Sequence, residues 1–587
     1  MIKLTGRKKK RPIVERTAAD DVVKLSWSQK WSRLQGRWTD PQWRRYAGLL
    51  IGGKCLGLVV LVAILFGGHY AYEMIAGTPA YAQAPAADPY AAIKPADHIN
   101  ALNTAWVLLG AFLVFGMQAG FTMLEAGFCR SRETVNVLVE CVFDTCVCGL
   151  IHWGWGFAFM FGAGNAFIGW HDPNDATKSF IFMKDVNVTT LYASTGIPVF
   201  AHYLFQFAFA DCASTICSGA MVGRTRFIGD VIYSIGVSGL IYPIFGHWCW
   251  GPDGFLATMG TPCHFLSGLG MNFHDFAGST VVHSIGGWVA IAGAIVLGPR
   301  LGRKFRRDGG APMLPHDLTI AVIGGLILWF GWYGFNPCST LSIMDAAGVG
   351  RVAMNTTLAA CTGGIAAVVL VFFMGGKWDT ASIINGFLAG LVAITCPCYW
   401  VSDVGSCVLG AVAGLLVVGG MELLEYLRID DPVGAWPVHG LCGIWGTLSL
   451  GLFASGQNSA AGSSPFGVPQ VAAKSADALT GLFYGGGTKV LAAQCVGSLV
   501  VCSATFVTAM AMFYALKAVR LLRLSHEGEL TGMDIDQHGI SAYPEYVISA
   551  LTAPHGMGPE TVGSGKVPVA PPEAALAPAK PMFAGGK

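Results

Sequence analysis

Charged residues are scarce in this chain of 587 residues, at 12% of the total. A soluble globular domain carries about 25% charged residues, so the shortage argues against a soluble protein. Hydrophobic residues make up 53% of the chain and come in long blocks rather than in alternation with polar ones. The formal net charge is only +2, and we expect a lipid bilayer rather than a nucleic acid as the partner.

The chain also lacks cysteines spaced as in a metal site, although it has 17 cysteines. Most of them lie inside the apolar blocks, where a free cysteine behaves as a small hydrophobic residue. Cys396 and Cys398 stand alone and do not recur with the spacing of a zinc site. Cys263, Cys338 and Cys398 are expected near the outer face, where a disulfide is feasible, but the sequence does not select the partners. We expect no metal and no cofactor.

Apolar blocks long enough to cross a bilayer as helices, about 20 residues each, recur along the chain. The first is at 48–67, and eleven more follow. We therefore expect an all-α polytopic membrane protein with eleven transmembrane helices and an additional N-terminal helix. The eleven expected spans are 102–128, 134–164, 196–222, 227–250, 275–298, 316–336, 351–375, 382–397, 403–424, 433–454 and 481–518.

The distribution of lysine and arginine predicts the orientation in the membrane. Basic residues cluster in the connections after every second span, most densely at 300–307, and the intervening loops are poor in them. Basic loops stay on the cytoplasmic side, so the core is expected to begin outside and to end in the cytoplasm. This arrangement fits a multi-pass protein of the cell's inner membrane.

The N-terminal region admits two interpretations. Residues 1–46 are basic, and 47–82 are apolar and end with an A-x-A pattern at Ala80 and Ala82. A signal peptide cleaved after Ala82 is one hypothesis; an uncleaved anchor helix is the other, because the basic segment is long for a signal peptide. The remaining divisions are a periplasmic linker at 83–100, a transmembrane domain at 101–518, a regulatory tail at 519–550 and a disordered tail at 551–587.

Two histidines lie deep inside apolar spans, where an ionisable side chain is costly and usually functional. His283 lies in the fifth span and His439 in the tenth, and each follows an aspartate by eight residues, Asp275 and Asp431 respectively. Matching features in two sets of five spans predict a 5+5 inverted repeat plus one helix, with a site where the repeats meet. The alternative is that each histidine is a core residue bonded to a backbone carbonyl.

The roles of the two aspartates are also open to more than one interpretation. Asp275 is expected at the outer end of its span, as a helix cap, as a carboxylate that stabilises a cation, or as both. Asp431 is expected to be a structural cap, with Pro432 at the first helical position.

Aromatic residues gather at the expected outer side. Trp250 ends the fourth span, Phe209 lies in the third, and Phe335 and Ser339 are one helical turn apart near the end of the sixth. Tryptophan at a membrane interface is ordinarily a belt residue, but aromatic faces supported by a carboxylate or hydroxyl also bind cations.

Five motifs in order resemble one family closely. They are MQAGFTMLEAGFCR (117–130), DFAGSTVVHSIGG (275–287), GWYGFN (331–336), DDPVGAWPVHGLCGIWGT (430–447) and HGISAYP (538–544). The chain resembles an ammonium transporter of the Amt/Mep/Rh superfamily, specifically of the Amt branch, over about residues 101–545.

The resemblance implies roles for particular residues. It implies an ammonium recruitment site from Trp250, Phe209 and Ser339 supported by Asp275, and a gate from Phe209 and Phe335. It implies a hydrophobic pore with His283 and His439 as twin histidines. It also implies a transporter rather than an enzyme, a homotrimer with one pore per subunit, and a PII-type regulatory protein as a candidate partner on the cytoplasmic face.

Three positions depart from the family pattern. Gly223 stands where many members carry an acid, Cys338 stands beside Ser339 where glycine is more usual, and Ile540 stands where an acid is common in the tail. The alternatives to an Amt transporter are a Rhesus-type channel for uncharged ammonia, an ammonium sensor that conducts little, and a membrane redox enzyme that uses the cysteines.

Overall fold

The computed structural model describes residues 96–192, 195–262, 264–456 and 479–544. The chain separates into two units, Met1–Lys94 and Pro95–Lys587, and only residues of the second are described. The predicted signal or anchor helix at 47–82, most of the linker at 83–100 and the tail at 551–587 therefore lie outside the described residues.

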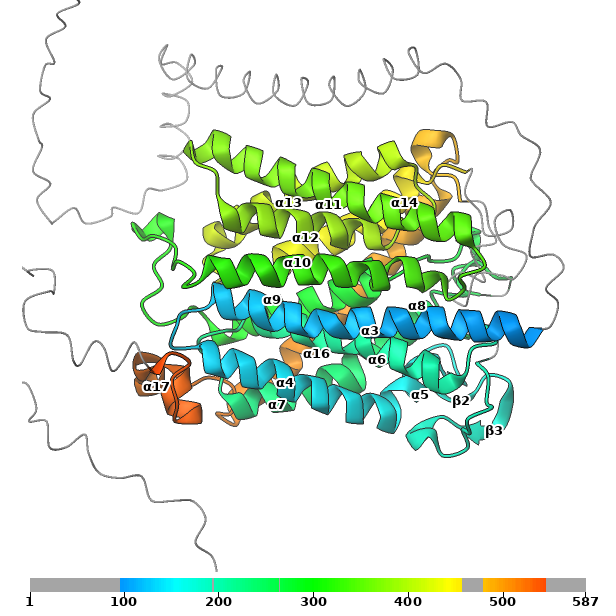
Figure 1. The fold of residues 1–587 in the computed structure, drawn as a ribbon, viewed down its shortest axis with the longest axis horizontal. Coiled ribbons are helices and arrows are strands. Elements are labelled where there is room, and N and C mark those ends of the chain that lie inside the picture. The colour runs from blue at the N-terminus through cyan, green and yellow to red at the C-terminus, as the bar shows by residue number, and fades with distance from the viewer. Residues whose placement is uncertain (1–95, 193–194, 263, 457–478, 545–587) are drawn as a thin grey trace, which may run out of the picture. The chain divides into compact units, whose positions relative to one another are not determined.

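Helical segments occupy all eleven predicted positions (Figure 1). Several are compound, because a π-helical turn (η) lies between two α-helices or directly before one. The segments are α3 (Ala96–Phe128); α4 (Thr134–Ile151), η1 (His152–Gly156) and α5 (Phe157–Phe161); α6 (Val199–Gly219); α7 (Phe227–Gly236), η3 (Val237–Ile241) and α8 (Tyr242–Trp250); η5 (Ser279–Ser284) and α9 (Ile285–Leu297); α10 (Leu318–Phe335); α11 (Ala346–Gly375); α12 (Thr380–Thr395); α13 (Asp403–Leu427); η8 (Trp436–Leu441) and α14 (Cys442–Phe453); and α16 (Lys489–Ala518).

Eight of these segments in the described part of the chain are long and apolar enough to cross a membrane, and α12 is a shorter apolar helix. Figure 1 shows the long helices running side by side in one bundle, with α3 next to α10 and α11 next to α12 and α13. The mostly helical, polytopic architecture agrees with the prediction.

Side-chain caps explain where several helices begin. An aspartate or serine at such a position accepts hydrogen bonds from the first backbone N–H groups, which have no partner within the helix. The caps of α10, α11, α12 and α13 are Asp317, Asp345, Asp379 and Ser402. The predicted end of the second span at 164 is too late, because Gly162 is already extended. The last helix begins at Lys489 rather than near 481, since 482–484 forms a separate 3-10 turn.

The all-α prediction did not include a small sheet in one loop. Strands β1 (Ala163–Gly164), β2 (Gly169–Asp172) and β3 (Asp175–Ser179) form a small antiparallel sheet in the order β1-β2-β3. The Asp172 side chain accepts a hydrogen bond from the backbone N–H of Asn174 at 2.8 Å, which stabilises the tight turn between β2 and β3.

A close approach of two helices sets the position of the buried histidines. A Cβ atom added at Gly287 would lie 2.2 Å from the backbone nitrogen of Gly440, so only glycine permits this crossing of α9 and η8. His283 stands four residues before Gly287, and His439 directly precedes Gly440. The crossing therefore brings the two histidine-bearing turns together.

Candidate functional site

Asp275 organises the turn that leads into η5. Its Oδ1 accepts from the backbone N–H groups of Gly278 and Ser279, both at 3.0 Å. Its Oδ2 accepts from Thr280 and Val281, both at 2.9 Å. Gly278 has φ of 116°, a left-handed conformation that favours glycine. The carboxylate is buried and fully occupied by the backbone, so it acts as a helix cap and can influence a cation only through its charge.

Asp431 has the same role at η8. Its Oδ1 accepts from Gly434 and Ala435 at 3.0 Å, and its Oδ2 accepts from Trp436 at 2.9 Å. Gly434 has φ of 81°, like the left-handed glycine three residues after Asp275. Pro432 lies in the turn before the helical residues, which corrects its expected place at the first helical position, because the capped turn delays the start of the helix.

The two histidines predicted to meet are hydrogen-bonded. The Nδ1 atoms of His283 and His439 are 3.2 Å apart, and the ring centroids are 5.3 Å apart. A bond between two Nδ1 atoms needs one donor and one acceptor, so at least one ring must be neutral. Both rings are buried, and Nε2 of His283 has no hydrogen-bond partner among the described residues. The alternative, in which each histidine bonds a backbone carbonyl, does not describe this geometry.

A column of aromatic rings stands next to this pair. Phe209 and Phe335 are stacked, with centroids 4.0 Å apart and an interplanar angle of 27°. Phe335 in turn stacks on His283 at 5.3 Å, and Trp332 stacks on the same imidazole at 5.0 Å. The rings on α6, α10 and η5 thus form a continuous row from Phe209 to the histidine pair.

The expected recruitment residues adjoin the far end of this row. Trp250 makes an edge contact with Phe209 at 6.3 Å between centroids. Its indole nitrogen donates to the backbone carbonyl of Asp275 at 2.8 Å, which fixes the ring orientation. The Ser339 hydroxyl donates to the carbonyl of Phe335 at 2.7 Å, so its oxygen retains lone pairs for another donor. The structure therefore brings all the predicted site residues except Asp431 into one connected group.

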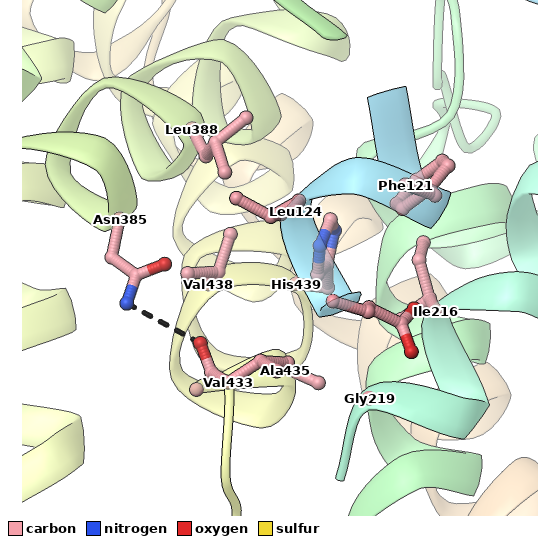
Figure 2. A pocket seen from close by; sticks show the side chains of 12 residues that line it. Phe121, Leu124, Ile216, Gly219, Asn385, Leu388, Val433, Ala435, Val438 and His439 are labelled. Atoms are coloured by element: carbon pink, nitrogen blue, oxygen red, sulfur yellow. Dashed lines mark hydrogen bonds between the residues drawn. The ribbon is translucent and has the colours of Figure 1, made fainter. Parts of the chain in front are cut away.

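A cavity lies at the other end of the pair (Figure 2). Apolar side chains from α3, α6, α12 and η8 surround His439 there, including Phe121, Leu124, Ile216 and Val438. Glu125 is the acidic residue in the lining. Figure 2 also shows Asn385, whose amide donates to the carbonyl of Val433 at 3.3 Å.

The sequence interpretation missed two residues of this site. Trp332 stacks on His283, and its position three residues before Phe335 was a usable signal, since such neighbours share a helix face. Glu125 stands inside the motif MLEAGF, where an acid in an apolar helix was a signal in itself. Neither had a partner that could be identified before the helices were placed.

The cysteines carry no disulfide in the described part of the chain. Cys338 and Cys398 are both free and buried, and Cys263 lies outside the described residues. Cys338 packs against α3, where a Cβ added at Gly110 would lie 2.4 Å from the Cys338 Cβ. The bulk of Cys338 therefore fits against a glycine of the neighbouring helix.

The tail after α16 contacts the basic end of the bundle. Helix α17 (His526–Thr531) and η10 (Asp534–His538) lie there (Figure 1). The Asp534 carboxylate accepts from the backbone N–H of Asn136 at 3.0 Å, and an imidazole nitrogen of His538 is 2.9 Å from the Asn136 side-chain oxygen. Burial raises the pKa of Asp534, although the backbone hydrogen bond from Asn136 opposes the change. Ile540 is exposed beyond these contacts.

Comparison with known proteins gives the family. A family model described as the Ammonium Transporter Family matches residues 105–543. The chain is 40% identical over 459 residues to the ammonium transporter Amt2 of Archaeoglobus fulgidus, which covers 78% of this chain and 91% of that protein. It is 38% identical over 434 residues to ammonium transporter 1 member 1 of Arabidopsis thaliana, which covers 72% and 81%.

Solved structures agree with the sequence relatives. A protein titled Sensor Amt Protein superposes with a TM-score of 0.64 at 32% identity, over 75% of this chain and 99% of that one. Mep2 of Saccharomyces cerevisiae superposes with a TM-score of 0.61 at 25% identity, over 73% and 88%. The matched family model covers most of the chain, and the chain belongs to the ammonium transporter family.

Proposed function

We propose that ammonium is recruited at Trp250, Phe209 and Ser339 and loses a proton at the Phe209–Phe335 gate. Ammonia then crosses the pore past His283 and His439, and the released proton passes separately to the inner side through a relay formed by the two imidazoles. The observation that carries this proposal is the hydrogen-bonded histidine pair directly behind the stacked phenylalanines.

Physical chemistry favours a deprotonated species inside. An unpaired ion in an apolar environment carries a large desolvation penalty, whereas neutral ammonia carries a much smaller one. The aromatic faces of Phe209 and Trp250 and the Ser339 oxygen replace part of the hydration shell of ammonium before it loses a proton. The imidazoles then offer one donor and one acceptor to a neutral molecule that can use both.

Methylammonium uptake and current under voltage control test this proposal. Wild type is compared with His283→Ala and His439→Ala in transporter-deficient cells or proteoliposomes. We expect both variants to lose coupled current. Wild-type coupled current in His283→Ala would contradict the relay role of the pair, and uptake without any current in wild type would favour a Rhesus-type channel for uncharged ammonia.

A second candidate function is ammonium sensing. The solved protein titled Sensor Amt Protein resembles this chain over 99% of its own length. Binding of ammonium by the purified protein without rescue of growth in transporter-deficient cells would favour a sensor. Rescue of growth would favour transport.

The same proposal includes the arrangement of the whole protein. We place all eleven helical segments across the inner membrane as a 5+5 inverted repeat plus one, with the core beginning outside and the tail in the cytoplasm. The matching capped turns at Asp275 and Asp431 support the repeat. A homotrimer, a PII-type partner at the tail and a signal or anchor helix at 47–82 belong to the proposal too. Crosslinking, co-purification and N-terminal sequencing of the mature protein test them in turn.

A further inference from the structure

Glu125 is a buried acid that the proposed pathway does not use. It lies on α3 with 2% of its surface exposed, and both its oxygens are within hydrogen-bond distance of the Ser218 hydroxyl on α6, at 3.0 and 2.8 Å. That hydroxyl also donates to the backbone carbonyl of Thr215 at 2.8 Å, so its oxygen can accept from a protonated Glu125. Among the described residues, no lysine or arginine forms an ion pair with it. An ionised carboxylate in such a position is costly unless a cation stands beside it.

The cavity beyond the histidine pair connects Glu125 with the pore. Glu125 and His439 line the same cavity, and the rest of its lining is apolar apart from Asn385 and backbone groups. A molecule that has passed His439 therefore meets one group that can give or accept a proton.

The cavity also has an exit. A second, larger cavity lies at the end of the bundle that carries Arg300 and Arg303, and both arginines and acidic residues such as Glu425 line it. The two cavities share Asn385, Val433 and Gly434 in their linings, so they adjoin. The space beside Glu125 thus leads toward the side that the lysine and arginine pattern assigns to the cytoplasm.

We propose that Glu125, positioned by Ser218, forms an inner ammonium site in which ammonia that has passed His439 is protonated and held before release. This inference rests on the proposed function, in which ammonia is the species that crosses the pore.

The proton balance is simple. The Glu125 carboxylic acid gives its proton to ammonia, which leaves a carboxylate paired with ammonium. Ammonium, with four N–H donors, fits a carboxylate that only accepts. When ammonium leaves through the second cavity, hydronium from the inner solution returns the proton to Glu125. Each cycle therefore consumes one proton from the inner side.

The surroundings of Glu125 favour a cation that binds and leaves over a permanent ion pair with a basic residue. Carboxyl groups act on it electrostatically, namely those of Asp144 on α4, Asp230 on α7 and Asp431 before η8, and the His439 imidazole lines the same cavity. Negative neighbours attract a cation to the cavity when Glu125 is ionised.

The test uses the full chain in proteoliposomes, with the inner pH varied at constant outer pH. Methylammonium uptake is measured for wild type, Glu125→Gln and Glu125→Asp. Glu140→Gln is the matched control, because Glu140 is also a buried acid, bonded to Asn136, and does not line the cavity. Size-exclusion profiles and thermal unfolding confirm that each variant is folded.

We expect wild-type uptake to depend on inner pH and Glu125→Gln to lose this dependence with at least a tenfold slower rate, since a positioned proton donor contributes about 10²–10⁴-fold. Glu125→Asp should restore part of both, and Glu140→Gln should keep the wild-type pH profile. A Glu125→Gln protein with the wild-type inner-pH profile would overturn the inner site.

Calorimetric titration of the purified proteins with ammonium separates this inference from the proposed function. Two equivalents bound by wild type and one by Glu125→Gln support the inner site, whether or not wild type transports. The same number of equivalents in both proteins contradicts it. Absence of transport in wild type contradicts the proposed function alone.

Discussion

The Nδ1 atoms of His283 and His439 lie 3.2 Å apart, although the residues are 156 positions apart in the chain. Their helices can approach this closely because Gly287 faces Gly440 where the two segments cross. The distance between the histidines therefore depends on Gly287, which has no side chain. Substitutions near the pair can distinguish the effect of helix packing from the effect of the imidazoles themselves.

Gly287→Ala should separate the histidines. The added methyl group would lie 2.2 Å from the Gly440 nitrogen, so the helices must move apart. We expect a loss of about 1–3 kcal/mol in stability, as for other overpacked sites, and at least a tenfold loss of methylammonium uptake. Thermal unfolding and uptake measure the two effects. Gly116→Ala is the control, because nothing lies within 4 Å of its added Cβ; normal uptake by Gly287→Ala would show that the close approach is dispensable.

Phe209→Leu should weaken ammonium recruitment while leaving the histidine pair intact. The substitution removes the ring that stacks on Phe335 and contacts Trp250. Loss of one cation–π face, worth roughly 0.5–2 kcal/mol, predicts an increase of about 2–30-fold in the apparent KM for ammonium. Current against ammonium concentration gives this value. Phe330→Leu, on the exposed face of α10, should leave the KM unchanged, and an unchanged KM in Phe209→Leu would remove Phe209 from the recruitment site.

Asp275→Asn and Asp431→Asn form a matched pair that distinguishes a cap from an electrostatic role. An amide has one accepting oxygen, so each variant loses part of its backbone hydrogen bonds and should be destabilised by about 1–3 kcal/mol. Only Asp275 adjoins Trp250, through the bond from the indole nitrogen to its carbonyl. We expect ammonium affinity on the outer side to fall in Asp275→Asn and not in Asp431→Asn, as measured by transport currents. Equal affinities in the two variants would mean that both aspartates are caps alone.

The Asp430–Arg300 ion pair should make stability depend on pH in one direction. Burial alone would raise the pKa of Asp430, but the guanidinium groups of Arg300 and Arg224 hold it well below its usual range. A carboxylate with a depressed pKa stabilises the folded state fully above the unfolded value of about 3.9, and this stability is lost as pH falls through the folded pKa. Asp430→Asn should therefore cost about 3–5 kcal/mol between pH 5 and 8, since it leaves Arg300 buried without its partner.

Thermal unfolding of wild type and Asp430→Asn between pH 3 and 8 checks this expectation. The difference between the two proteins should be constant above pH 5 and should shrink below pH 4. Asp308→Asn, which removes an exposed partner of Arg428, should have a much smaller effect. A difference that grows as pH falls would contradict the assignment.

The helical segments could be predicted from the sequence because a bilayer constrains length and polarity together. Each of the eleven expected spans overlaps a helical segment, although several of the boundaries differ. The small sheet at β1–β3 could not be predicted, because its strands are short and their pairing depends on a turn at Asp172. The start of η8 was placed too early, since the bonds from the Asp431 carboxylate hold Pro432 and Val433 in a turn.

Some residues of the candidate site could also be predicted from the sequence, and others could not. Phe209, Trp250, His283, Phe335 and His439 could be named from unusual residues in apolar spans and from the family motifs. Trp332 and Glu125 could not be assigned, because a stacked ring and a cavity lining exist only between helices. Composition and spacing by themselves determined the class of protein and the residues that are costly to bury, since each residue carries its own desolvation cost. Only the tertiary structure decided which of them meet, because contacts such as His283–His439 depend on how closely two backbones can approach.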